Sequence, residues 1–125
     1  MSPNVAVGME NLAFAVLFVT MGFLLVTGRV PMNRRFGFRS HKAYESHETW
    51  GKINRYGGYR LIGWSSAMLG AGLLALFRSY EDNATLVFVL SFAPLLAIVR
   101  VVSESRRYTR RLSDPQPGQM EKAKE

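Results

Sequence analysis

The chain has 125 residues, a formal net charge of +7 and no cysteine. Its length allows one domain, and the lack of cysteine excludes disulfide bridges, thiolate catalysis and cysteine metal sites. Mean hydropathy is near zero at +0.02, but the apolar residues gather in three blocks with the charges between them. A soluble domain would instead spread its charges along every helix. The sequence therefore predicts an all-α integral membrane protein and not a soluble enzyme.

The first apolar block runs from Asn11 to Gly28 without a charged residue. Its length is close to the lower limit for crossing a hydrocarbon core of about 30 Å. No basic residue precedes it, and no small-x-small cleavage site follows it, so a cleaved signal peptide is not favoured. We expect a retained helix over about 9–28.

Two further apolar blocks cover 61–77 and 83–99. Flanking aromatic and basic residues can extend each block at headgroup depth. Pro94 lies within the third block and is expected to kink that helix without breaking it. We expect the second and third transmembrane helices over about 58–78 and 83–103.

The second block is rich in small residues at a spacing of four: Gly63 with Ala67, and Ser66 with Gly70. Such faces let two helices approach closely in a membrane. They predict packing against the first or third helix or against another copy of the chain. The alternative interpretation is that these small residues reflect the ordinary composition of such a helix and do not mark a packing face.

Positive charge is concentrated in 29–60 and after residue 100, whereas the connection before the third helix contains Glu81 and Asp82. With three spans, both basic segments lie on one side of the membrane. The positive-inside rule places that side in the cytoplasm and the N-terminus outside. The excess charge then meets anionic lipid headgroups instead of nucleic acid. The candidate lipid contacts are Arg34, Arg35, Arg106, Arg107, Arg110 and Arg111.

Two polar segments flank these spans. The segment 113–125 has the composition of a disordered cytoplasmic tail. In the first loop, Ser46 resembles a helix N-cap, and Glu48 in the first turn suits the helix dipole. We therefore expect a cytoplasmic interfacial helix over about 46–56, with Trp50 in a headgroup belt of aromatic residues. It either bends at Gly57–Gly58 or continues into the second span.

The segment 28–58 combines more basic, aromatic and turn residues than a plain connector needs. Gly37 between two phenylalanines predicts a fixed backbone with glycine at a tight turn. We expect Asn33 and Asn54 to brace this loop by bonding backbone carbonyls and amides. Arg39, together with Arg34 and Arg35, can make bidentate contacts to phosphate.

Two interpretations of these arginines stay open. They form a site for a lipid headgroup or another anionic ligand at the inner surface. Alternatively, they belong to a structural loop, satisfy membrane topology and pair with Glu45 and Glu48.

The loop sequence also resembles a known family. Its two linked motifs read Pro31-x-Asn33-x-x-Phe36-Gly37-Phe38-Arg39-Ser40 and, after a spacer, Trp50-x-x-x-Asn54-Arg55-x-x-Gly58. This pattern, over about 28–75, resembles that of the SdpI family. The resemblance implies a bacterial cytoplasmic (inner) membrane protein that gives immunity to a membrane-active peptide by binding. The best-known family member is longer, with more spans, and also holds a transcriptional repressor at the membrane.

Catalytic and metal-binding patterns are not evident. His41, Glu45 and Glu48 would share a helical face next to His47, but the metalloprotease histidine motif is absent and basic neighbours oppose a cation. No nucleophile set, P-loop or dinucleotide pattern occurs, and the apolar blocks lack the carboxylates that proton-coupled transport favours. We predict no enzyme activity, no metal and no cofactor.

Three functions are therefore compared. The leading one is peptide immunity by binding. The second is an accessory structural subunit of a larger membrane complex, and the third is a membrane anchor that recruits a cytoplasmic regulator. The expected partners are the anionic bilayer and either a peptide toxin or other membrane proteins, with a homo-oligomer possible for such a small chain.

Overall fold

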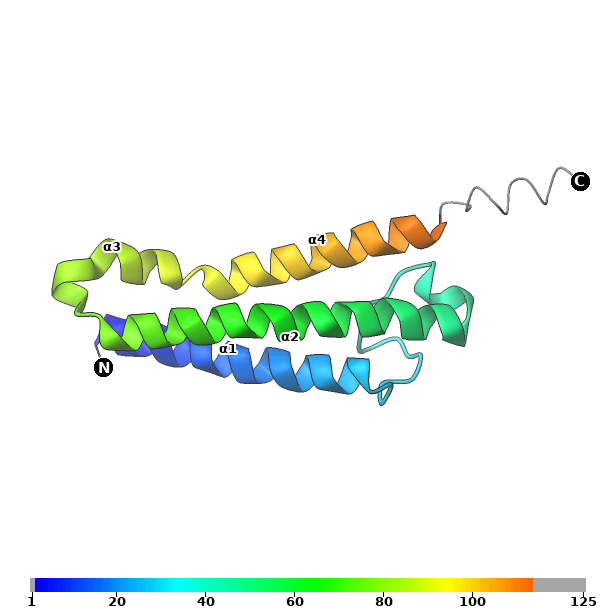
Figure 1. The fold of residues 1–125 in the computed structure, drawn as a ribbon, viewed down its shortest axis with the longest axis horizontal. Coiled ribbons are helices and arrows are strands. Elements are labelled where there is room, and N and C mark those ends of the chain that lie inside the picture. The colour runs from blue at the N-terminus through cyan, green and yellow to red at the C-terminus, as the bar shows by residue number, and fades with distance from the viewer. Residues whose placement is uncertain (1, 114–125) are drawn as a thin grey trace, which may run out of the picture.

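The computed structural model describes residues 2–113, which form helices and turns without a strand (Figure 1). Three helical stretches are long and apolar enough to cross a membrane: Pro3–Val26, His47–Phe77 and Glu81–Leu112. The prediction of an all-α membrane protein with three transmembrane helices is confirmed. The elements are α1 (Pro3–Val26), η1 (Ala43–Glu45), α2 (His47–Phe77), α3 (Tyr80–Leu90) and α4 (Ala93–Ser113).

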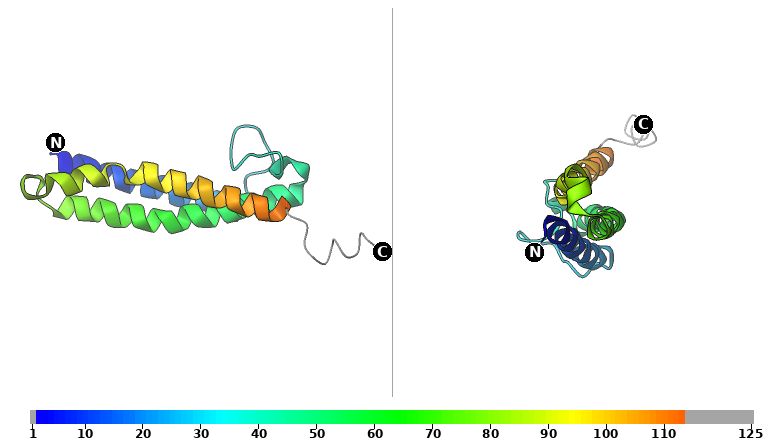
Figure 2. Two further views of the ribbon diagram at one scale, coloured as in Figure 1. Left: turned by 90° about the horizontal axis from the view of Figure 1, so that it is seen from above. Right: turned by 90° about the vertical axis from the view of Figure 1, so that its left-hand side faces the viewer.

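The three spans lie side by side with alternating direction (Figures 1 and 2). Helix α2 makes the main contacts with both α1 and α4, which touch each other little. The N-terminus and the α2–α3 connection lie at one end of the bundle, and the first loop and the last turns of α4 lie at the other (Figure 1). Both basic segments therefore share an end. Which side of the membrane this end faces stays a prediction.

Helices α1 and α2 approach each other along a seam of small buried residues. A Cβ atom on Gly22 would lie 2.6 Å from the carbonyl oxygen of Gly58, and one on Gly72 would lie 3.0 Å from that of Gly8. Close helix contact of this kind needs residues without bulk at the crossing. The α1–α2 seam repeats every seven residues and consists of Gly8, Ala15 and Gly22 on α1 and Gly58, Ser65 and Gly72 on α2, all buried.

The small residues singled out by their four-residue spacing lie elsewhere. Gly63, Ser66, Ala67 and Gly70 are exposed, and a Cβ atom on either glycine would meet nothing within 4 Å. The predicted packing of this face against another helix of the chain is therefore wrong. The seven-residue repeat on the opposite side of α2 takes that role.

The first residue of α1 differs from the expected one, whereas α2 begins where the predicted N-cap Ser46 placed a helix start. Helix α1 begins at Pro3 and not near residue 9, because proline suits a first helical turn, where its missing N–H is not needed. Helix α2 begins after Ser46, whose Oγ accepts a hydrogen bond from the Thr49 amide at 3.0 Å. The helix continues through Gly57 and Gly58, so a separate interfacial helix over 46–56 is not confirmed.

Pro94 has a larger effect than expected. Instead of a kink, Ser91 and Phe92 form a turn that separates α3 from α4. Proline has no N–H to donate to the carbonyl of Leu90, and Nδ2 of the buried Asn11 donates to that oxygen at 3.1 Å instead. Helix α4 extends to Ser113, beyond the predicted end near 103, and the rest of the predicted tail lies outside the described residues.

Candidate functional site

The first turn of the loop is built around Asn33. Its Nδ2 donates to the carbonyl of Pro31 at 2.7 Å, and its Oδ1 accepts from the amides of Arg35 and Phe36 at 2.8 and 2.6 Å. The Tyr44 hydroxyl donates to the Asn33 carbonyl at 2.8 Å. One side chain thus satisfies three backbone groups, and the predicted bracing role of Asn33 is confirmed.

Asn54 fastens the second part of the loop to α2. Its Oδ1 accepts from the Phe38 amide at 2.6 Å, while its Nδ2 donates to the carbonyls of Phe38 and Trp50 at 3.3 and 3.0 Å. The side chain is only 2% exposed. Because an unpaired buried backbone group is costly, these bonds fix the conformation of the loop at Phe38. The predicted bracing role of Asn54 is confirmed as well.

Two glycines allow the loop to lie against α2. Gly37 has φ of +98°, a conformation that L side chains rarely adopt. A Cβ atom there would also lie 2.5 Å from Oδ1 of Asn54. At Gly57 a Cβ atom would lie 2.1 Å from the ring of Phe38. The predicted glycine at a tight turn is confirmed, and Gly57 provides the surface on which Phe38 packs.

Trp50 lies beneath the loop. It is 3% exposed, and its Nε1 donates to the carbonyl of Val30 at 3.0 Å. Its ring lies 5.6 Å from that of Tyr44. Its hydrogen bond and its packing both hold the loop, and its expected place in an aromatic belt at headgroup depth stays a prediction. Trp50 is part of a buried hydrophobic cluster under the loop. The cluster consists of Ala43, Trp50 and Ile53, with Val30, Met32, Phe38, Tyr108 and Leu112 packed against it.

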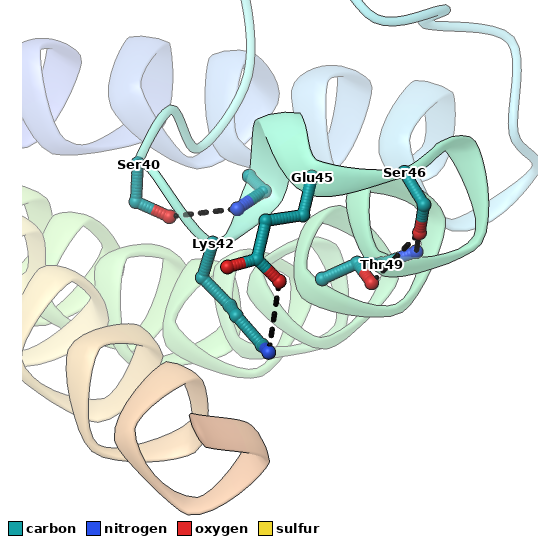
Figure 3. A network of polar contacts seen from close by, with 6 residues as sticks. Ser40, Lys42, Glu45, Ser46 and Thr49 are labelled. Carbon is teal, nitrogen blue, oxygen red and sulfur yellow. Dashed lines mark hydrogen bonds and ion pairs between the residues drawn. The ribbon is translucent and has the colours of Figure 1, made fainter.

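The carboxylates near the loop already have partners. Lys42 and Glu45 form an ion pair at 2.9 Å (Figure 3). Beside it, the Ser40 hydroxyl accepts from the Ala43 amide, and the Ser46 hydroxyl contacts that of Thr49. Glu48 pairs with Lys52 at 3.0 Å. The expected pairing of the loop arginines with Glu45 and Glu48 is therefore wrong.

The loop arginines are exposed. Arg39 donates a close hydrogen bond to the carbonyl of Arg34. Within residues 2–113, the described ion pairs use Arg60 and Arg100 but none of the loop arginines. The site thus combines a fixed backbone with uncompensated positive charge. The exposed arginines are Arg34, Arg35, Arg39 and Arg55 around the loop, and Arg106, Arg107, Arg110 and Arg111 on α4.

The other motif residues divide between surface and packing. Pro31 is exposed at the first turn, and Ser40 is half-buried beside η1. Gly58 belongs to the α1–α2 seam, where a Cβ atom would lie 2.8 Å from the carbonyl oxygen of Gly22. The structure therefore assigns the end of the second motif to helix packing and not to the loop.

The last turns of α4 belong to this region, which the sequence did not indicate. The rings of Tyr56 and Tyr108 stack at 4.3 Å. Glu104 forms an ion pair with Arg60 on α2 and reaches Arg100 at 3.9 Å. Arg60 and Glu104 are 44 positions apart in the chain, and a contact between such distant segments leaves no periodic signal in a sequence. In residues 2–113, no three His, Cys, Asp or Glu side chains gather into a group that could hold a metal.

These features define a small helical membrane protein with a braced, arginine-rich loop between its first two spans. The chain belongs to the SdpI/YfhL protein family, whose model matches residues 29–103. The match covers the loop, all of α2 and α3, and α4 up to residue 103. No curated protein and no solved structure matches the chain.

Proposed function

We propose that this chain gives resistance to a membrane-active peptide. We propose that it acts by binding through the motif loop, which is the segment 28–58 that contains both family motifs. It sits in the bacterial cytoplasmic membrane, with the loop and the end of α4 on the cytoplasmic side, where the outward arginines meet anionic headgroups. Family membership supports the proposal. The observation that carries it is a loop backbone fixed by Asn33 and Asn54 around arginines that have no carboxylate partner within residues 2–113.

The chemistry of the loop suits binding more than proton transfer. A guanidinium group stays protonated at neutral pH and offers only donors, so it can hold an anionic group but cannot act as a general base. The side chains of Asn33 and Asn54 order the loop before any ligand arrives. Such preorganisation lowers the entropic cost of binding.

A survival assay tests the proposal. A sensitive bacterial strain that expresses the chain is challenged with a panel of membrane-active peptides, among them the killing peptide that SdpI-type immunity proteins resist. We expect survival above the vector control for at least one peptide. We expect Arg39→Ala to abolish protection and Arg78→Ala to retain it, because exposed Arg78 follows α2 at the opposite end of the bundle. Survival at the vector level for every peptide would refute the proposal.

The exposed small-residue face of α2 favours a second candidate, an accessory subunit of a larger membrane complex. Gly63, Ser66, Ala67 and Gly70 leave room for the close approach of another helix. Isolation of the tagged chain in mild detergent, followed by mass spectrometry, distinguishes the two functions. Large partners at equal stoichiometry would support the subunit, whereas recovery of the chain alone would exclude it.

A further inference from the structure

A pocket of about 320 Å³ lies between the motif loop and α4. This volume is at the lower end of the range of about 300–1,000 Å³ that is typical of ligand sites. The loop contributes segment 37–40 to the pocket, and α2 contributes Ile53. Helix α4 contributes Val102 and three polar residues that follow it by one to two turns. The polar side chains that line it are Arg39, Ser40, Ser105, Arg106 and Thr109.

The residues that line the pocket, in the described part of the chain, carry two positive charges and no negative one. Arg39 and Arg106 both line it, and no described Asp or Glu does. The carboxylates elsewhere in this region are already paired, Glu45 with Lys42 and Glu104 with Arg60. Among residues 2–113, neither pocket arginine has an ion pair. An anion entering the pocket would therefore meet two guanidinium groups without competition from an internal carboxylate.

A buried hydroxyl provides an independent sign of a ligand. Ser105 is 4% exposed, and its Oγ has no hydrogen-bond partner among the described residues. Buried polar groups in native proteins are nearly always satisfied, and an exception calls for a missing partner. Because Ser105 is one of the residues that line the pocket, an anionic oxygen bound there would supply an acceptor for its hydroxyl.

From these three observations we propose that the pocket binds a phosphate ester. Guanidinium groups hold phosphate oxygens in bidentate pairs, and hydroxyl groups add further donors. Phe38, Ile53 and Val102 give the pocket an apolar side, which suits the carbon substituent of an ester better than it suits inorganic phosphate alone. The phosphate belongs either to a lipid headgroup or to a soluble ester.

The inference deepens the proposed function, on which its biological meaning rests, by naming the ligand class of the same loop. It also extends the site beyond the family match, which ends at residue 103, because Ser105, Arg106 and Thr109 lie after that point. The stacked Tyr56 and Tyr108 rings hold this part of α4 against α2.

The test uses the full chain purified in a phosphate-free maltoside detergent. Calorimetry measures binding of glycerol 3-phosphate as the soluble ester. Native mass spectrometry measures retention of phosphatidylglycerol, with diacylglycerol as the counterpart that lacks phosphate. We expect binding of at least one phosphate source, and we expect Arg39→Gln and Arg106→Gln each to weaken it roughly tenfold or more, the usual weight of a charge-assisted hydrogen bond.

Arg78→Gln is the matched control, because Arg78 is an exposed arginine that follows α2 at the opposite end of the bundle and does not line the pocket. Ser105→Ala separates a ligand contact from a structural role. If Ser105 binds phosphate, this variant loses much of the rise in melting temperature that the ligand causes while its melting temperature without ligand does not fall. Melting temperatures of all variants show that each is folded.

The two sources of phosphate give different outcomes. Retention of phosphatidylglycerol alone assigns the pocket to a lipid headgroup, and binding of glycerol 3-phosphate alone assigns it to a soluble ester. Binding of neither overturns the inference, as does equal weakening in Arg78→Gln and the pocket variants. Peptide protection without phosphate binding would refute this inference and leave the proposed function standing. Phosphate binding without peptide protection would refute the proposed function and leave this inference standing.

Discussion

The motif loop and the α1–α2 seam belong to one bundle but are held by different interactions. In the seam, backbones of two helices meet because Gly22 and Gly58 have no side chains. In the loop, the side chains of Asn33 and Asn54 bond to the backbone. The comparison teaches that added volume should damage the seam and lost hydrogen bonds should damage the loop. Function is expected from the loop and not from the seam, because exposed arginines surround the ordered backbone of the loop.

The largest expected effect comes from volume added to the seam. Gly22→Val forces the helices apart, because even its Cβ would lie 2.6 Å from the Gly58 carbonyl oxygen. We expect the free energy of unfolding in micelles to fall by about 3 kcal/mol or more, as overpacking of a tight contact can cost. Gly70→Val is the control, because a Cβ atom there would meet nothing within 4 Å. An equal loss of unfolding free energy in the two variants would contradict the claim that α1 and α2 pack closely at this seam.

The second effect comes from a lost hydrogen bond in the loop. Asn54→Ala leaves the Phe38 amide without its acceptor, which costs about 1–3 kcal/mol. We expect faster tryptic cleavage after Arg34 and Arg35, because the loop opens while the helices persist. Asn83→Ala is the control, since Asn83 bonds the Ser79 carbonyl at the other end of the bundle. An unchanged cleavage rate in Asn54→Ala would show that the loop is held by other contacts.

The third comparison separates backbone strain from contact. Gly28 and Gly37 both have positive φ, at +72° and +98°, and an L side chain at such an angle costs roughly 1–2 kcal/mol. Only at Gly37 would a Cβ atom also approach Asn54, whereas nothing lies within 4 Å at Gly28. Gly37→Ala should therefore lower the free energy of unfolding more than Gly28→Ala. The opposite order would show that Asn54 moves aside without cost.

The smallest effect is expected from the ion pair that joins α2 to α4. The Arg60 side chain is 43% exposed and that of Glu104 is 14% exposed, and solvent weakens such partly exposed pairs. A double-mutant cycle with Arg60→Gln and Glu104→Gln should give a coupling energy below about 1 kcal/mol. A much larger coupling would make this pair, and not the Tyr56–Tyr108 stack, the main contact that holds the end of α4.

The sequence predicts the spans and the braces but not how the helices meet. Length and hydropathy reveal the three spans, and the turn chemistry around Asn33 and Gly37 predicts an ordered loop. The α1–α2 seam is not predicted, because its small residues recur every seven positions. The pairs spaced by four residues, Gly63 with Ala67 and Ser66 with Gly70, give a stronger pattern in the sequence. The α3–α4 break depends on Asn11, which binds the carbonyl freed by Pro94 from another helix.

The phosphate pocket was equally out of reach from the sequence. Arg106 stands out only as one of several basic residues after the third span. Its position beside Arg39 depends on α4 packing against the loop, and Arg106 follows Arg39 by 67 positions in the chain (106 − 39). Predicting such a neighbour requires the register between helices, which hydropathy does not specify.

The claim that the braced loop is the active part is tested most directly by cell survival with Arg39→Ala and Arg39→Lys under peptide challenge. The amount of each protein in the membrane is measured in the same cultures. The account predicts normal amounts of both variants, survival at the vector level for Arg39→Ala, and at most partial protection for Arg39→Lys, because lysine keeps the charge but loses the bidentate fork. Wild-type survival of Arg39→Ala at normal amounts would contradict it.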